Sequence, residues 1–92
     1  MIVYAECEYF IPTAQSLKEK RAILQRMLTR TKQKFNVSVA EIDHQDTWQR
    51  TRLALVTVAS AREAADREMM RALHYLASNP AWEELNVWRD YV

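Results

Sequence analysis

The chain has 92 residues, of which 49% are hydrophobic and 27% charged, with a net charge of +1, one cysteine and no glycine. This composition predicts one globular domain, residues 1–92, and no apolar run approaches the roughly 20 residues that span a membrane. Phosphate-binding loops and dinucleotide fingerprints need glycine, so those function classes are excluded. A lone cysteine, with no basic leader or cleavage site at the N-terminus, predicts a cytoplasmic protein.

Residues 2–11 have the alternation of a strand that is covered on one side only. One side carries no charge and includes Cys7, whereas the other side carries Tyr4, Glu6, Glu8 and Phe10. We expect the uncharged side to face the core, with Cys7 as a buried, inert thiol, and the charged side to stay open.

Residues 16–35 predict an amphipathic helix, because a capping box of Ser16 and Glu19 precedes apolar residues at helical spacing. The segment holds seven Lys or Arg and one Glu, while the rest of the chain is net acidic. Five of these cations lie off the apolar stripe: Lys18, Arg21, Arg26, Arg30 and Lys32. Two roles suit these cations: contact with nucleic-acid phosphates, or an ordinary solvated helix face, which is what charge runs usually form. The helix has no aromatic ring on which a base could stack.

Lys20 falls inside the apolar stripe of the same helix. Two arrangements suit a lysine at the edge of a core. Its aliphatic stem can run along the apolar surface to bring the ammonium to solvent, or its ammonium can pair with a carboxylate. Of these we expect the first.

Two strands are predicted at about 36–46 and 49–59, joined by a polar segment without Gly or Pro. This hairpin carries side chains that turn geometry does not require: Asp43, His44, Gln45, Asp46, Trp48, Gln49 and Arg50. We interpret it as a recognition tip, because binding residues gather on loops held by a rigid scaffold. The plainer alternative is that Asp43 and Asp46 cap turn amides.

A third interpretation is acid–base catalysis by His44, oriented by Asp43 or Asp46. It ranks last because the sequence offers no nucleophile, metal set or phosphate loop. Along a strand His44 and Asp46 share one side while Asp43 points away, and only His74 adds a second imidazole. We therefore expect no enzymatic activity and no metal or other cofactor, and no small-molecule substrate is indicated.

The second half of the chain repeats the first. Residues 60–63, Ser-Ala-Arg-Glu, form a second capping box, and Asn79-Pro80 predicts the end of that helix with Asn79 in the left-handed conformation. A last strand is expected at about 84–91. The order β-α-β-β-α-β predicts an α+β, ferredoxin-like fold, in which two helices cover one face of a four-stranded antiparallel sheet.

On the open sheet face, the strand order places the third strand beside the first. We therefore expect Glu6 and Glu8 to form cross-strand ion pairs with Arg50 and Arg52. The same face should expose three aromatic residues that suit a homodimer or a partner protein: Tyr4, Phe10 and Trp88. The alternative is a sheet face that stays wet. Trp82 is expected as core or interface filler.

Four stretches carry a resemblance to a known family. They are residues 10–12, residues 16–21, residues 35–41 and the run Asp43-His44-Gln45-Asp46-x-Trp48-Gln49-Arg50. With this spacing the chain resembles the YlxP-like family of small bacterial proteins of unknown function. The resemblance implies a ferredoxin-like fold, self-association and a gene often found among translation and ribosome-maturation genes. It implies no activity.

Together these features favour a non-enzymatic binding module that acts around RNA or the ribosome. The basic helix would bind phosphates and the hairpin would add specific contacts. The alternative is a homodimeric interaction or assembly domain that uses its open sheet face.

Overall fold

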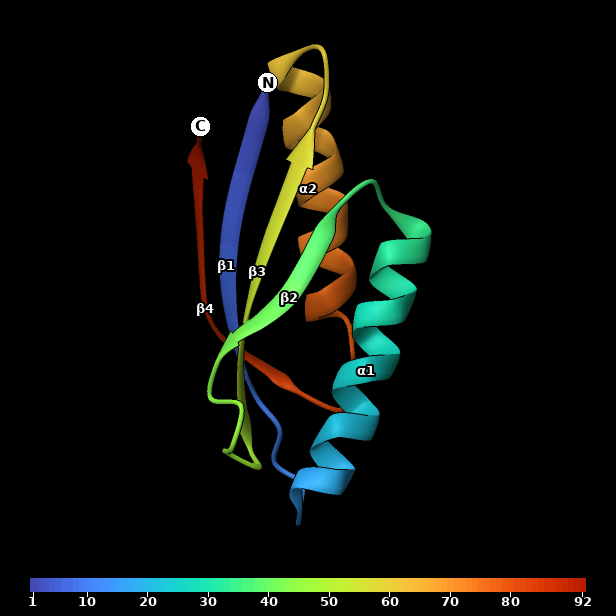
Figure 1. Ribbon diagram of the computed structural model, residues 1–92, viewed down its shortest axis with the longest axis vertical. Helices are drawn as coiled ribbons and strands as arrows, with labels where there is room; N and C mark the ends of the chain where they lie inside the picture. The colour runs from blue at the N-terminus through green and yellow to red at the C-terminus, as the bar shows by residue number, and fades with distance from the viewer.

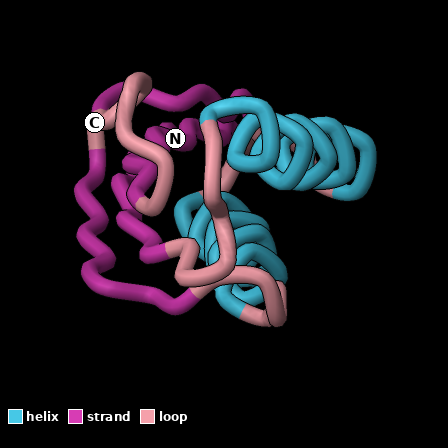
Figure 2. The backbone as a smooth tube through the Cα atoms, turned by 90° about the horizontal axis from the view of Figure 1, so that it is seen from below, coloured by secondary structure: helices cyan, strands magenta, loops and turns pink.

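A computed structural model describes all 92 residues and has the predicted order of elements (Figure 1). In chain order they are β1 Ile2–Phe10, α1 Leu17–Lys34, β2 Ser38–Asp43, β3 Arg50–Val58, α2 Arg62–Ala77 and β4 Glu83–Tyr91. The strands form one antiparallel sheet in the order β2-β3-β1-β4, and both helices lie against the same face (Figure 2). The ferredoxin-like α+β fold is therefore confirmed. Neither helix has the length and apolar character needed to cross a membrane.

The core lies between the sheet and the helices, and the alternation of side chains along β1 determines which of its residues enter the core. Val3, Ala5, Cys7 and Tyr9 are buried on the helix side, as predicted. The Tyr9 ring stacks on Trp82 at 4.4 Å between centroids, and the Trp82 indole donates to the carbonyl of Leu76. Trp82 is thus a core residue.

The predicted cap of α1 is present. The Ser16 hydroxyl accepts from the backbone N–H of Glu19 at 3.1 Å, as an N-cap does. The Glu19 carboxylate reaches back one residue further than in a standard capping box and accepts from the N–H of Gln15 at 2.6 Å. Both bonds fix the start of α1 and hence the positions of the cations that follow.

The predicted cap of α2 is wrong. The N-cap is Ala61, with no side-chain hydrogen bond, because β3 extends its pairing through Ala59, whose N–H donates to the carbonyl of Met1. This extension leaves Ser60 one position too early to cap. At the other end α2 stops where expected, but Asn79 is not left-handed: Ser78 closes the helix and the Asn79 side chain accepts from the N–H of Ala81.

Candidate nucleic-acid interface and hairpin

The five predicted phosphate-binding cations of α1 are all exposed: Lys18, Arg21, Arg26, Arg30 and Lys32. None of them lies within ion-pair distance of a carboxylate of the protein. At 100° per residue, Arg26 and Arg30 lie on one flank of the helix, while Lys18 and Arg21 lie on the other. The free positive charge therefore extends around the solvent side of α1 and along most of its length.

Lys20 behaves differently from its neighbours, and the expectation that it reaches solvent is wrong. Its side chain is buried, and its ammonium lies 3.0 Å from the Glu41 carboxylate of β2. The same ammonium donates to the carbonyl of His44 at 2.5 Å and lies 3.5 Å from that of Gln45. The hydroxyl of Thr51 donates to Glu41 as well. Removing the ammonium from water costs free energy, and these acceptors offset that cost. The same bonds attach the hairpin to the first turn of α1.

His44 begins the hairpin in the left-handed backbone conformation, which is unfavourable for any residue other than glycine. Its φ is 64°, the only positive φ in the chain. The Asp43 carboxylate accepts from the N–H of His44, and the carbonyl of His44 accepts from the N–H of Thr47, which closes a turn. The bonds to Lys20, Asp43 and Thr47 hold the backbone in this left-handed state at a cost of about 1 kcal/mol.

Gln49 fastens the other side of the hairpin. Its side-chain amide donates to the carbonyls of Pro12 and Ala14, and its own carbonyl accepts from the N–H of Ile11. The segment between β1 and α1 is thereby bonded to the hairpin. Gln49, like His44, therefore builds the tip and is not free to bind a partner through its side chain.

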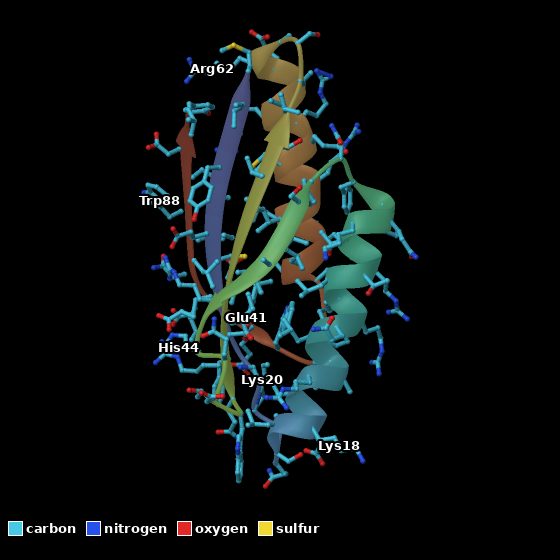
Figure 3. All side chains as sticks on the ribbon, viewed as in Figure 1. Lys18, Lys20, Glu41, His44, Arg62 and Trp88 are labelled. Atoms are coloured by element: carbon cyan, nitrogen blue, oxygen red, sulfur yellow. The ribbon has the colours of Figure 1, made fainter.

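The remaining predicted tip residues, Gln45, Asp46 and Trp48, are exposed and make no side-chain hydrogen bond or ion pair within the protein. The Trp48 side chain is 50% exposed. Figure 3 shows the hairpin at the end of the molecule where α1 begins, with Lys18, Lys20 and His44 at that end. The tip is thus a rigid loop that presents unused side chains beside the start of the basic helix.

The open face beside the hairpin carries the predicted ion pairs. Arg50 and Arg52 both contact the Glu8 carboxylate, and Arg52 also bonds Glu6 at 2.8 Å. The His44 imidazole lies 3.3 Å from Glu8. The bond from Arg50, then that from Arg52, lowers the pKa of the Glu8 carboxyl, and the bonds from the Tyr4 hydroxyl and Arg52 lower the pKa of Glu6. Four charges are therefore neutralised within the sheet.

The aromatic residues predicted as an interface do not form one group. Tyr4 and Trp88 meet edge-to-face at 5.9 Å, whereas Phe10 lies at the other end of β1, opposite Arg50. The open face divides accordingly. Glu6, Glu8, Arg50 and Arg52 occupy the hairpin half, while the other half is mostly apolar: Ile2, Tyr4, Ala40, Ala54, Val56, Val58 and Trp88.

The geometry gives little to the catalytic interpretation. The Asp43 carboxylate accepts from the backbone N–H of His44, and the Asp46 side chain makes no hydrogen bond or ion pair, so neither orients the imidazole. Glu8 does, but two arginines already hold that carboxylate. No group of three or more His, Cys, Asp or Glu side chains has a metal-binding arrangement.

The sequence interpretation missed the structural role of Glu41 and Thr51, which hold Lys20. A weak signal was available, since a lysine inside an apolar stripe needs a partner on the facing strand. It also missed the cation–π contact of Lys34. The Lys34 ammonium lies 4.9 Å from the centroid of the Tyr75 ring, so this cation already has a partner on α2.

Comparisons with known proteins identify the family of this chain and a solved structure with a similar fold. Residues 2–89 match the family described as "Protein of unknown function (DUF503)". The "Uncharacterized protein YlxP" of Bacillus subtilis (strain 168) is 52% identical over 83 residues, which cover 90% of each chain. Among solved structures, the "De novo designed protein Foldit4" superposes over 100% of this chain and 99% of its own, with a TM-score of 0.61 and 16% identity. That last likeness concerns the fold alone.

Proposed function

The chain belongs to the DUF503 family of proteins of unknown function, and we propose that it is a non-enzymatic, cytoplasmic binding module for RNA, free or within the ribosome. In this proposal α1 binds the phosphate backbone and the hairpin tip contacts bases. One observation carries it: five exposed cations without a carboxylate partner lie on a helix whose first turn is bonded to a rigid loop with an exposed tryptophan.

The two parts would contribute differently. Each cation adds a salt-sensitive term that does not depend on sequence. Along α1, Lys18 and Lys32 are about 21 Å apart at 1.5 Å per residue, a length that several phosphates can occupy. The helix has no aromatic ring, but Trp48 at the neighbouring tip supplies a surface on which a base can stack. Gln45 and Asp46 add hydrogen-bonding groups there.

The test uses two arginine pairs with the same spacing. Arg26 and Arg30 on α1 are replaced by Glu, and the matched control replaces Arg67 and Arg71, which are exposed four residues apart on α2. Both variants change the net charge equally. Binding is measured by co-sedimentation with ribosomes and by anisotropy of labelled single-stranded RNA across a salt series.

The α1 variant should bind at least about tenfold more weakly, and the negative slope of log affinity against log salt should become shallower by about 2. The α2 variant should stay within about twofold. Trp48→Ala should weaken binding by up to about tenfold without changing the slope, because stacking is not ionic. Equal loss in both arginine variants, or no binding by the wild type, would remove the proposal.

A second candidate function, a homodimeric interaction domain, is supported by the apolar half of the open face. Val56 and Val58 are exposed there beside Tyr4, and no element covers them. Val56→Glu should then abolish a dimer seen by gel filtration with light scattering, whereas Met70→Glu on α2 should not. A wild-type chain that is monomeric at about 200 µM would exclude this candidate.

A further inference from the structure

The two edges of the sheet are built differently. β2 has six residues and is interrupted by an irregularity between Glu41 and Asp43, and such short, bulged edges resist pairing with another chain. β4 has nine residues, and every one of them is exposed. Its irregularity lies near its start, where Leu85 has no partner on β1, so residues 86–91 form an unbroken edge.

The helices do not shield this edge. α2 packs mainly on β1 and β3 and contacts β4 through Asp66, which lies beside the Arg89 guanidinium and accepts from the Tyr91 hydroxyl. The outer edge of β4 stays at the side of the sheet opposite α1 (Figure 1). Val87 and Arg89 lie on the helix side of β4, opposite Cys7 and Ala5, while Asn86, Trp88 and Asp90 lie on the open face. The Trp88 side chain is 47% exposed.

The free backbone groups of β4 can be identified. The N–H of Val92 donates to the carbonyl of Ile2, so the backbone groups of even-numbered residues point toward β1. Those of Val87, Arg89 and Tyr91 therefore point outward. The Asp90 carboxylate accepts a hydrogen bond from the N–H of Tyr91. The backbone N–H and C=O groups of Val87 and Arg89 therefore remain free to pair with another strand.

From this edge we infer that a second copy of the chain pairs antiparallel along β4 and extends the sheet to eight strands. A two-fold axis perpendicular to the sheet keeps each residue on its own face, so the pairing must be centred on a residue of β4. Centring on Arg89 would oppose two guanidinium groups. Centring on Val87 would place the bulged Leu85 opposite Arg89 of the second copy, whose backbone groups are open.

Centring on Trp88 avoids these conflicts. Val87 then lies opposite Arg89 of the second copy, and their open backbone groups exchange both hydrogen bonds. Asn86 faces Asp90, where an amide can donate to a carboxylate. The two Trp88 side chains become a close pair on the open face, each already in contact with Tyr4. Four aromatic rings would leave water together, which is where the free energy of association would come from.

Disulfide trapping tests both the dimer and its register. The native thiol, which is buried, is first removed by Cys7→Ala. In that background Val87→Cys and Arg89→Cys are purified separately, mixed and oxidised under native conditions. Opposite residues of an antiparallel pair fall within disulfide range, whereas residue 87 of the two copies would lie beyond it. The mixed dimer should exceed either homodimer at least about tenfold on non-reducing gels.

Further variants separate this dimer from the stacking of open faces. Asn86→Cys mixed with Asp90→Cys keeps both Trp88 side chains and should form a disulfide between the copies, whereas Val56→Cys, at the middle of the open face, should form none. Sedimentation equilibrium should show the dimer for wild type and for Val56→Glu alike. Trapping through Val56→Cys, an excess of the Val87→Cys homodimer, or a monomer at about 200 µM without any trapped species would overturn the inference.

Discussion

The ammonium of Lys20 lies 3.0 Å from the carboxylate of Glu41, and this buried contact joins the first turn of α1 to β2. That ammonium has three protein acceptors, which are the Glu41 carboxylate and the carbonyls of His44 and Gln45. The exposed tip residues and the exposed start of α1 are therefore parts of one rigid unit. That rigidity is what the proposed binding surface depends on.

Lys20→Met should lower the free energy of unfolding by about 3 kcal/mol. The thioether fills similar space, but Glu41 loses its cation and two hairpin carbonyls lose their donor, and breaking a buried pair from one side costs this much. Urea denaturation followed by circular dichroism measures the change. Lys18→Met, two residues earlier and exposed, is the control and should stay within about 0.5 kcal/mol. An equal effect of the two variants would show that the pair contributes nothing.

The sequence predicts most of this fold because its local signals agree with one another. The alternation in β1 identified the buried face, and the strand order then placed Arg50 and Arg52 near Glu6 and Glu8. The prediction of the α2 cap was wrong because the bond from Ala59 to Met1 continues the strand pairing past the end of β3 and shifts the start of the helix. A four-residue pattern does not contain this tertiary effect.

The candidate site was less predictable for the same reason. The composition of the hairpin singled out residues 43–50, but it did not separate those that build the tip from those left free. Gln49 builds it only because the segment after β1 passes within reach of its amide. Likewise, Glu41 is the partner of Lys20 because β2 passes beside the first turn of α1 at that residue. The spacing of apolar residues along the sequence does not contain this information.

His44→Gly should leave the protein about 1 kcal/mol more stable than His44→Ala. Glycine adopts a φ of 64° freely, whereas alanine keeps the cost of the left-handed conformation, and both variants lose the same imidazole contact with Glu8. Thermal unfolding of the two variants measures the difference. Equal stability would mean that the turn relaxes to another conformation once the imidazole is removed.

Acid should weaken the fold through Glu6 and Glu8. Their pKa values are lowered in the folded state, so the unfolded chain takes up protons first, starting near its ordinary value of about 4.3. The stability they provide is complete above that pH and is lost as pH falls through the lowered folded values. Urea midpoints between pH 7 and pH 3 should show this fall.

The Glu8→Gln variant should be less stable at pH 7 and depend less on pH, because the remaining amide cannot neutralise Arg50. Glu63→Gln on α2 makes no such contact and should reproduce the wild-type profile. A wild-type profile in Glu8→Gln would show that other carboxyl groups cause the acid transition.

Cys7 should resist modification while the protein is folded. Burial raises the pKa of its thiol to about 11, so very little thiolate exists at pH 8 and no reagent reaches it. Ellman's reagent should react at least about a hundredfold faster in 6 M guanidinium than in buffer. Fast reaction of the native protein would mean that β1 opens locally.

Tyr9→Phe should stabilise the protein, which is unusual for a change in the centre of a core. The Tyr9 hydroxyl is buried without a hydrogen-bond partner, while its ring stacks on Trp82 at an interplanar angle of 10°. Phenylalanine keeps the stack and removes the unsatisfied group, so the free energy of unfolding should rise by about 1 kcal/mol. Tyr4→Phe is the matched control, because it removes a hydroxyl that donates to Glu6 at 2.8 Å and should therefore destabilise. Urea denaturation of both variants separates the two cases. If Tyr9→Phe instead lost about 1 kcal/mol, the hydroxyl would have a stabilising partner in the core, either the neighbouring Cys7 thiol or a buried water.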